Sequence, residues 1–251
     1  SEKYKGEIHF STGSNTARSS SNFYALNNGI ATLFEIRGVG IGKTSFKRRI
    51  NSGLAVGFSF LKTAYENSNF ILNQIDIAKT YTNDIVLEHK RSIYTDVIKA
   101  IDIESNELID FTTTMHSSKE SYAISKRDRP LAYIIKQNNF GFIEKLKDVG
   151  IDFIEFQKDT VIYSGSYRVI EFNDNFKVYE KMRMQKVVTS IDYNDNRFSK
   201  GDILISMNQK RSNLIAELLE PEAPNSYVSF GIINTSLNKK LPIYRIKNFN
   251  N

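Results

Sequence analysis

The sequence predicts an α/β segment followed by a β-rich α+β domain, and two observations lead to this fold class. The first is a strand–turn–helix pattern in the N-terminal part of the chain. The second is a series of short apolar runs separated by turn residues in the C-terminal half. We therefore divide the 251-residue chain into residues 1–70, a connecting region over 71–129, and an α+β domain over 130–251.

The strand–turn–helix pattern begins with "IATLFEIR" at 30–37, an apolar run of strand length. A glycine-rich turn follows, and Thr44 or Ser45 is placed to cap the next helix. Apolar residues then recur every three or four positions, which predicts a helix over 44–66 with one apolar face. These residues are Phe46, Ile50, Leu54, Phe58, Leu61 and Tyr65. The polar run "YENSNF" at 65–70 is expected to end this helix.

The connecting region has weaker patterns. "SIYTDVIKAI" at 92–101 fits a helix, whereas "ELIDFTTTM" and "SYAIS" further on predict strands. The C-terminal half is clearer. "PLAYII" and "IDFIEF" predict two strands, and "NNFGFIEKLKDVG" at 138–150 predicts a helix closed by Gly150, so the three form a βαβ unit.

The remaining C-terminal residues predict an antiparallel component. Apolar residues at even spacing from Phe176 to Val188 indicate strands, and "NDNRFSKG" supplies a turn before "DILISM". A short helix, "NLIAELL", is expected to end near Pro221, and "LPIYRI" is the last predicted strand.

Composition excludes several function classes. Hydrophobic residues make up 40% and charged residues 25% of the chain, as in ordinary globular proteins. The chain has no cysteine, so disulfides and thiolate metal sites are excluded. No apolar run approaches the roughly 18 residues of a membrane span. The net charge of +6 is spread along the chain without a basic stripe, so we expect neither a membrane nor a nucleic acid as partner.

The glycine turn at 38–44 has part of the pattern of a phosphate-binding P-loop. Such a loop needs the pattern G-x-x-x-x-G-K-[ST], in which backbone amides surround the phosphates. Gly42, Lys43 and Thr44 fit this pattern, but Arg37 stands where the first glycine is required. The turn is therefore interpreted as a change of chain direction between strand and helix.

Glu35 is unusual because a carboxylate inside an apolar strand must be paired or lie at the edge of a site. Arg37 lies two residues further, on the same face of the predicted strand, so an ion pair is one interpretation. The other interpretation is a catalytic carboxylate.

The surrounding sequence supports the catalytic interpretation. "RSSSNFYALNNGIATLFEIRGVGIG" followed by "FKRRI" resembles the C-terminal part of the catalytic domain of M14 zinc carboxypeptidases, in particular the bacterial branch. The segments "RPLAYIIKQNNFGFIEKLKDVGIDF", "GDILISMNQKRSNLIAELLEPEAPNSY" and "LPIYRI" resemble the extension that follows that domain. Together these matches cover about half of the chain and keep the order found in the family.

The resemblance implies roles for four residues. Glu35 occupies the position of the general base that activates zinc-bound water in this family. Arg18 is the nearest candidate to hold the terminal carboxylate of a peptide, with Asn22 and Tyr24 beside it. Each has an alternative interpretation: Arg18 as a solvated surface residue, Asn22 as a turn residue, and Tyr24 as a half-buried core ring.

The zinc ligands of the family are not found in this sequence. They consist of an H-x-x-E pair and a later histidine, all upstream of the general base. The chain has three histidines, His9, His89 and His116, and none begins H-x-x-E. His9 is interpreted as structural. The first residue, Ser1, also suggests a processed or truncated chain.

The resemblance therefore implies an incomplete carboxypeptidase-like α/β domain with an α+β extension. Zinc would belong to the complete enzyme, and this chain alone is expected to bind no zinc and to be inactive. The expected partners are a peptide substrate and the missing N-terminal half of the catalytic domain. The family also suggests an exported protein.

A rival hypothesis is a non-catalytic module over 130–251 that binds peptide or glycan. The 13 Tyr and 17 Phe residues motivate it, although core packing explains many of them. A nucleotide-binding protein is the third hypothesis.

Overall fold

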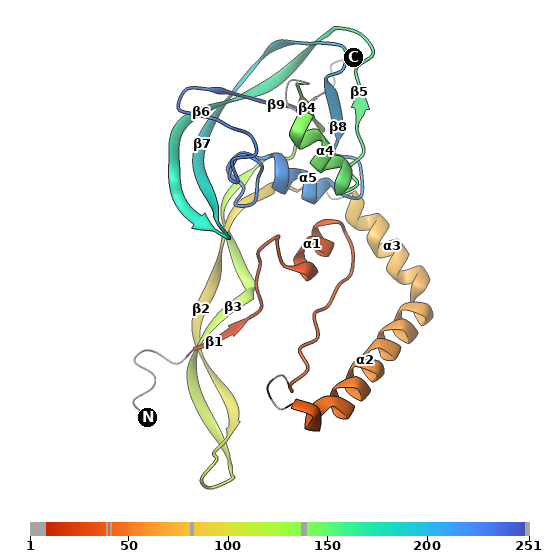
Figure 1. Ribbon diagram of the computed structural model, residues 1–251, viewed down its shortest axis with the longest axis vertical. Helices are drawn as coiled ribbons and strands as arrows, with labels where there is room; N and C mark the ends of the chain where they lie inside the picture. Colours follow the sequence, from red (N-terminus) through yellow and green to blue (C-terminus); the bar gives the residue numbers. More distant parts are fainter. Residues whose placement is uncertain (1–8, 39, 41, 81–82, 137–139, 249–251) are drawn as a thin grey trace.

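The computed structural model describes residues 9–38, 40, 42–80, 83–136 and 140–248, and it contains two β-sheets (Figure 1). A three-stranded sheet has the order β1-β3-β2, and a six-stranded sheet has the order β5-β8-β4-β9-β6-β7. The six-stranded sheet and two helices form a C-terminal body. The long β2–β3 hairpin extends from this body, and helices α2 and α3 lie to one side of the hairpin (Figure 1).

The six-stranded sheet contains most of the strands predicted after residue 130. Its strands are β4 (Ala132–Ile135), β5 (Ile154–Glu155), β6 (Thr160–Tyr179), β7 (Met182–Phe198), β8 (Ile203–Ser206) and β9 (Lys240–Ile246). A two-residue turn joins β6 to β7, and both of its residues, Glu180 and Lys181, have positive φ angles of 46° and 67°. Positive φ at both central residues matches the right-handed twist of a hairpin.

The predicted βαβ unit is present, with one strand inserted between its two strands. β4 and β5 are joined through helix α4 (Phe140–Asp148). Both strands pair antiparallel with β8, so they run parallel to each other. Gly150 has a φ of 69° directly after α4, as expected for a glycine that ends a helix. The first two residues of the predicted helix, 138 and 139, lie outside the described residues.

The core lies on the face of this sheet that is covered by α4 and α5 (Ser212–Leu219). Fully buried side chains there include Tyr133, Leu146, Tyr167, Ile215 and Leu219. A smaller cluster around Ile134, Phe198 and Ile246 covers the other face. These two clusters hold the body together, because burial of large apolar side chains is the main stabilising term.

The connecting region forms strands where a helix was expected at 92–101. This segment belongs to β2 (Ile85–Ile101), which pairs antiparallel with β3 (Leu108–Arg127) along nearly its whole length. The segment is rich in β-branched residues, such as Ile93, Thr95 and Val97, which favour extended backbone. The helix prediction was therefore wrong, whereas the strands predicted further on are both part of β3. β1 (His9–Thr12) adds to β3 in parallel.

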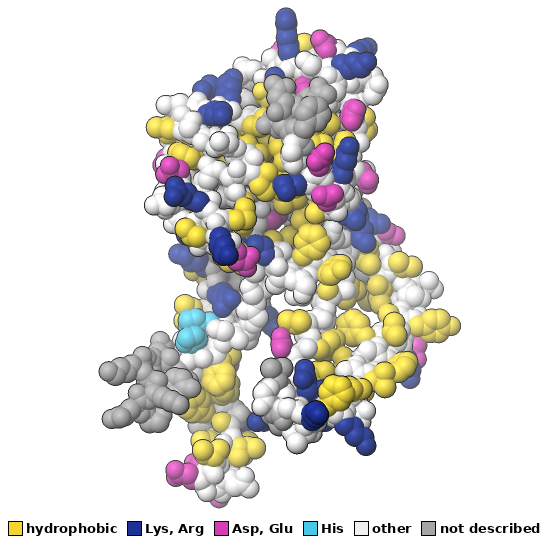
Figure 2. Space-filling model, in the orientation of Figure 1, with side chains coloured by type: hydrophobic (Ala, Val, Ile, Leu, Met, Phe, Trp, Pro, Cys, Tyr) yellow, Lys and Arg dark blue, Asp and Glu magenta, His cyan; other side chains and the backbone are white. Residues whose placement is uncertain are grey.

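The predicted amphipathic helix is present as α2 (Phe46–Glu66), preceded by a short 3₁₀ turn over Gly42–Ser45. It ends at Glu66, and a further helix that was not predicted, α3 (Ser68–Lys79), begins after the single residue Asn67. α1 (Ser20–Leu26) is shorter. Neither α2 nor α3 has a buried residue, and the large apolar side chains exposed on α2 range from 43% for Phe60 to 84% for Tyr65. Figure 2 shows apolar side chains gathered over these helices.

The predicted strand at 30–37 is not a strand. This segment is irregular, and its apolar residues Ile30, Leu33 and Phe34 are exposed by 63%, 64% and 47%. A strand needs a neighbouring strand for its backbone hydrogen bonds, and none of the described strands pairs with this segment. Phe34 instead packs edge-on against Phe60 of α2, with ring centroids 5.6 Å apart. Among the described residues, no helix is both long and apolar enough to cross a membrane.

Candidate functional site

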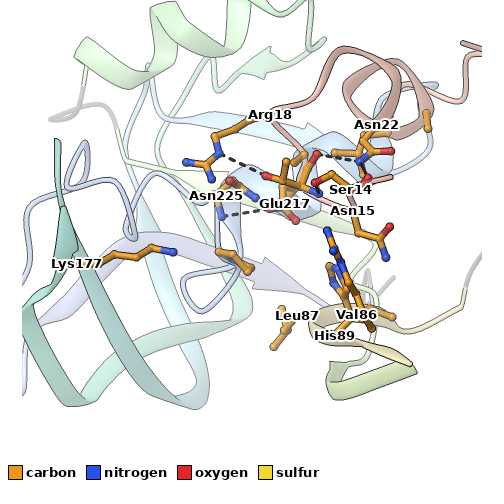
Figure 3. A pocket seen from close by; sticks show the side chains of 16 residues that line it. Ser14, Asn15, Arg18, Asn22, Val86, Leu87, His89, Lys177, Glu217 and Asn225 are labelled. Atoms are coloured by element: carbon orange, nitrogen blue, oxygen red, sulfur yellow. Dashed lines mark hydrogen bonds between the residues drawn. The ribbon is translucent and has the colours of Figure 1, made fainter. Parts of the chain in front are cut away.

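A pocket of about 620 Å³ lies where α1, β2, β6 and α5 meet (Figure 3). We call it the Arg18 pocket and define it by six of its polar lining residues, Arg18, Asn22, His89, Arg91, Lys177 and Glu217. Apolar side chains, including Leu26, Val86 and Leu87, complete its wall. Its volume is within the range of about 300–1,000 Å³ that is usual for small-molecule sites.

Local hydrogen bonds hold the segment before α1 at one wall of this pocket. The Asn22 amide donates to the backbone carbonyls of Ser14 and Thr16, the latter at 3.0 Å. Asn15 donates to the carbonyl of Ser118 in β3 at 3.0 Å. Arg91 of β2 donates to the carbonyl of Gly13 at 3.1 Å. The segment is thus tied to both β2 and β3, and this fixes the position of Arg18.

The Arg18 guanidinium lies 3.5 Å from the centroid of the Tyr179 ring, a cation–π arrangement. Its Nε donates to Thr16 Oγ1 at 3.4 Å. Within the described parts of the chain, no carboxylate lies within ion-pair distance of Arg18, Arg91 or Lys177. The pocket therefore carries positive charge that the described residues do not neutralise through ion pairs.

Glu217 is the acidic residue of the pocket. Its Oε1 accepts hydrogen bonds from the Asn225 backbone N–H at 3.2 Å and from Asn225 Nδ2 at 2.6 Å. Burial raises the pKa of Glu217 above its ordinary value, because removal from water disfavours the charged carboxylate, while the bonds from Asn225 and the charge of His89 act in the opposite direction. Asn225 thus fixes the orientation of this carboxylate at the α5 side of the pocket (Figure 3).

The structure brings together two of the four residues that the sequence singled out. Arg18 and Asn22 both line the pocket. The Asn22 bonds are those of a turn residue, which was the alternative interpretation of its role. Tyr24 is 58% exposed on α1 and does not line the pocket, and its ring is not in the core as the alternative interpretation had it.

Glu35 lies in the irregular segment after α1 and is exposed to solvent. It is not among the residues that line the Arg18 pocket. The ion pair with Arg37 that its sequence position suggested does not form in the described structure, and the Arg37 carbonyl instead accepts a hydrogen bond from Arg48 at 2.6 Å. The surroundings of Glu35 therefore show neither the ion pair with Arg37 nor the catalytic site that its sequence position suggested.

The glycine turn after Glu35 has the geometry of a tight change of direction. Gly38 has a φ of 145°, and a Cβ atom at this position would lie 2.5 Å from Arg49 Cδ and 2.8 Å from Ser45 Oγ. Ser45 Oγ donates to the Gly38 carbonyl at 2.9 Å, which ties the turn to the start of α2. Glycine is therefore required here for close packing of the turn on the helix.

The described residues do not fit a zinc site. His9 and His116 stack on each other in the three-stranded sheet, with ring centroids 4.3 Å apart, and His89 lies in the Arg18 pocket. No group of three or more His, Asp or Glu side chains among the described residues is placed to hold a metal ion. A protein zinc site takes three or four such ligands, so zinc would have to be held by residues outside this set.

The β-rich module has a smaller cleft of about 280 Å³, lined by Tyr163, Tyr193, Lys247 and Asn248. The two tyrosine rings stack with centroids 6.1 Å apart, and the Lys247 ammonium lies 5.1 Å from the Tyr193 centroid. Aromatic rings beside polar groups suit a peptide or a glycan equally well, so the rival hypothesis of a binding module stays a prediction.

Three of the residues in the Arg18 pocket were not singled out from the sequence: Arg91, Lys177 and Glu217. They come from β2, β6 and α5, and each lies in a segment whose sequence pattern shows only a strand or a helix. The net charge of +6 is the one related feature of the sequence, and it does not indicate where these residues lie.

Comparison with known proteins identifies relatives for most of the chain. Carboxypeptidase 2 of Trichophyton equinum is 29% identical over 230 residues, which cover 90% of this chain and 43% of that protein. Carboxypeptidase 2 of Trichophyton rubrum is 29% identical over 232 residues, with the same coverage. Probable carboxypeptidase 2 of Arthroderma benhamiae is 28% identical over 203 residues, which cover 79% of this chain and 39% of that protein.

The chain spans less than half the length of these relatives. No family model matches the chain, and no solved structure matches it significantly. The relatives are fungal, so they do not test the resemblance to the bacterial branch in particular. Their shared name supports a relationship of this chain to the carboxypeptidases.

Proposed function

We propose that this chain supplies the C-terminal portion of a zinc metallocarboxypeptidase of the M14 type, which removes C-terminal residues from peptides. The observation that carries the proposal is its similarity to proteins named carboxypeptidase 2 over 90% of its length. The chain covers 43% of those relatives, so a complete enzyme of this kind would contain a further part. Zinc would be held by that part, and this chain alone would be inactive.

The Arg18 pocket supports the proposal with a suitable chemistry. The two terminal nitrogens of the Arg18 guanidinium can hold a terminal carboxylate by paired hydrogen bonds, because the cation–π contact with Tyr179 occupies a face of the group and the bond to Thr16 uses Nε. Arg91 and Lys177 add positive charge to the same pocket. A peptide bound here would present its C-terminus to Arg18, beside the end of β6.

In this proposal Glu35 accepts a proton from the attacking water and later passes it to the leaving amine, as a general base and acid. This role requires Glu35 to approach the peptide held at Arg18. The segment around 30–37 would therefore occupy another position in the complete enzyme, paired as a strand with the further part of the catalytic domain.

The apolar face of α2 and α3 is the surface that we propose contacts this further part. The exposed side chains include Phe46, Leu54, Phe58, Phe70 and Leu72, with exposed fractions of 57–65%. Contiguous apolar surface of this kind usually marks an interface. The segment around Leu33 and Phe34 continues it on the same side through the contact with Phe60.

The test is the Glu35→Gln substitution in the complete enzyme. Loss of the carboxylate base should lower kcat for release of a C-terminal residue by about 10²–10⁴-fold. Glu66→Gln is the matched control, because Glu66 is exposed on α2 and makes only an ion pair of 3.8 Å with Lys62. Hydrolysis near the wild-type rate in the Glu35→Gln enzyme would remove Glu35 from the mechanism.

A further inference from the structure

The cations of the Arg18 pocket are arranged for a ligand with two carboxylates. Tyr179 and Lys177 are two residues apart on β6, where the pairing with β7 is regular. Residues at this spacing lie on the same face of a strand, about 7 Å apart. Because the Arg18 guanidinium lies on the Tyr179 ring, Arg18 and Lys177 are neighbours along this face.

Two neighbouring cations repel each other, and an anion that lies between or beside them offsets this repulsion. Lys177 is exposed, and its ammonium is 5.4 Å from the centroid of the Phe176 ring. Glu217 is an acidic residue of the pocket wall, and Asn225 binds its Oε1. Glu180 accepts a hydrogen bond from the Tyr179 side chain. Among the described residues, no ion pair joins either carboxylate to Arg18 or Lys177. The positive charge is thus available to a ligand.

We propose that the Arg18 pocket selects peptides whose C-terminal residue is Asp or Glu. This inference rests on the proposed function, in which Arg18 holds the terminal carboxylate. The side chain of a C-terminal residue begins at the carbon that carries this carboxylate. A second carboxylate one or two methylene groups further out is therefore close to Lys177, the neighbouring cation on the face of β6. Figure 3 shows Lys177 extending from β6 toward the pocket.

The size of the effect is limited by solvent. Lys177 and Arg18 are both exposed, so water and salt screen their interaction with an anion. A single added charge pair of this kind is expected to strengthen binding about three- to tenfold. Arg91 adds to the attraction between the pocket and an anion. It also donates a hydrogen bond to the Gly13 carbonyl, which holds Arg91 in the pocket wall.

The experiment measures binding of short peptides to the 251-residue chain by isothermal titration calorimetry. The probes are acetyl-Gly-Glu, acetyl-Gly-Gln and acetyl-Gly-Lys, in which Gln matches Glu in shape without its charge. We expect acetyl-Gly-Glu to bind about three- to tenfold more tightly than acetyl-Gly-Gln, and acetyl-Gly-Lys to bind most weakly. The Lys177→Gln variant should bind acetyl-Gly-Glu and acetyl-Gly-Gln with equal affinity, so that the preference for Glu is lost.

Lys186→Gln is the matched control. Lys186 is exposed on the same hairpin, and it lies 5.5 Å from the same Phe176 ring, but it does not line the pocket. It should keep the preference for Glu. Circular dichroism of each variant checks that the fold is unchanged.

Four results would overturn the inference. Equal affinity for the Glu and Gln peptides, with loss of both in Arg18→Gln, would leave the proposed function standing and remove the acidic preference alone. An equal effect of Lys177→Gln and Lys186→Gln would show an unspecific charge effect. Inorganic phosphate that binds as tightly as acetyl-Gly-Glu would show an anion site without peptide selectivity. Absence of binding for all three peptides would remove the role of Arg18 in the proposed function, and this inference with it.

Discussion

Replacement of Glu220 with alanine is expected to destabilise the C-terminal body by about 5 kcal/mol. Glu220 is completely buried, yet its carboxylate has three side-chain partners. Oε1 accepts hydrogen bonds from the hydroxyls of Tyr133, at 2.5 Å, and Tyr167, at 2.9 Å. Oε2 accepts from Arg127 at 2.7 Å, and Arg127 also binds Glu222 at 2.6 Å. The cluster joins β3, β4, β6 and the end of α5.

The magnitude follows from the groups that would lose a partner. Removal of one member of a buried ion pair costs about 3–5 kcal/mol, because the other charge stays buried. Each of the two tyrosine hydroxyls left without an acceptor adds about 1–3 kcal/mol. Arg127 keeps Glu222, and losses within one network are not additive, so the total is taken as about 5 kcal/mol. That is a large part of the roughly 5–15 kcal/mol that holds a typical domain folded.

The tyrosines act as donors at all ordinary pH values. Burial raises the pKa of Tyr133 and of Tyr167 well above 10, and the negative charge of Glu220 raises it further. Glu220→Gln keeps the size and one acceptor oxygen for these hydroxyls but loses the charge opposite Arg127. Its cost should be smaller, about 1.5–3 kcal/mol, which is the value of a hydrogen bond to a charged group.

The assay is urea unfolding followed by circular dichroism, with the slope m compared between variants to check that the unfolding transition is the same. Glu66→Ala is the surface control and should change the free energy of unfolding by less than about 0.5 kcal/mol, since its ion pair with Lys62 is exposed. A cost below about 1 kcal/mol for Glu220→Ala would refute the reasoning, because it would mean that the three hydrogen bonds contribute nothing beyond those of water.

Two further substitutions probe the sheet and the pocket. Gly165→Ala should destabilise the chain by about 1–3 kcal/mol in the same urea assay, because its Cβ would lie 2.7 Å from Ile191 and 2.8 Å from the Tyr193 ring; an unchanged midpoint would contradict the observed packing. Glu217→Gln should raise the melting temperature more at pH 7 than at pH 4. The folded-state pKa of Glu217 is raised above its ordinary value of 4.5, so the cost of its charge is absent below that value and grows as pH rises through the folded-state pKa. A gain that is equal at both pH values would contradict this assignment.

Local patterns in the sequence were sufficient for part of the fold. Helix α2 follows from apolar residues that recur with the helical period, and β4 and β9 follow from short apolar runs. The segment 92–101 was misassigned because its apolar spacing also fits a helix, and only the pairing with β3 decides between the two. Helix α3 was not predicted, because the polar residues around Asn67 indicate the end of a helix. In the structure they form a break between α2 and α3.

Less of the candidate site than of the fold could be predicted from the sequence. Arg18 and Asn22 were identified through a resemblance, and they do lie in one pocket. Lys177 and Glu217 join them only through the packing of β6 and α5 against the N-terminal segment. The same holds for the bond between Arg127 and Glu220, which are 93 residues apart. No short sequence window contains such pairs, so their chemistry appears only after the chain has folded.

The irregular segment at 30–37 and the exposed face of α2 have one physical explanation under the proposed function. A helix satisfies its backbone hydrogen bonds internally, so α2 needs no neighbouring segment for them. A strand depends on neighbours, and the apolar run around Glu35 finds none among the described strands. A partner that supplied a sheet edge beside this run and covered α2 would satisfy both at once. Glu35 would then be held in an ordered strand beside a covered helix, which is the environment that a general base requires.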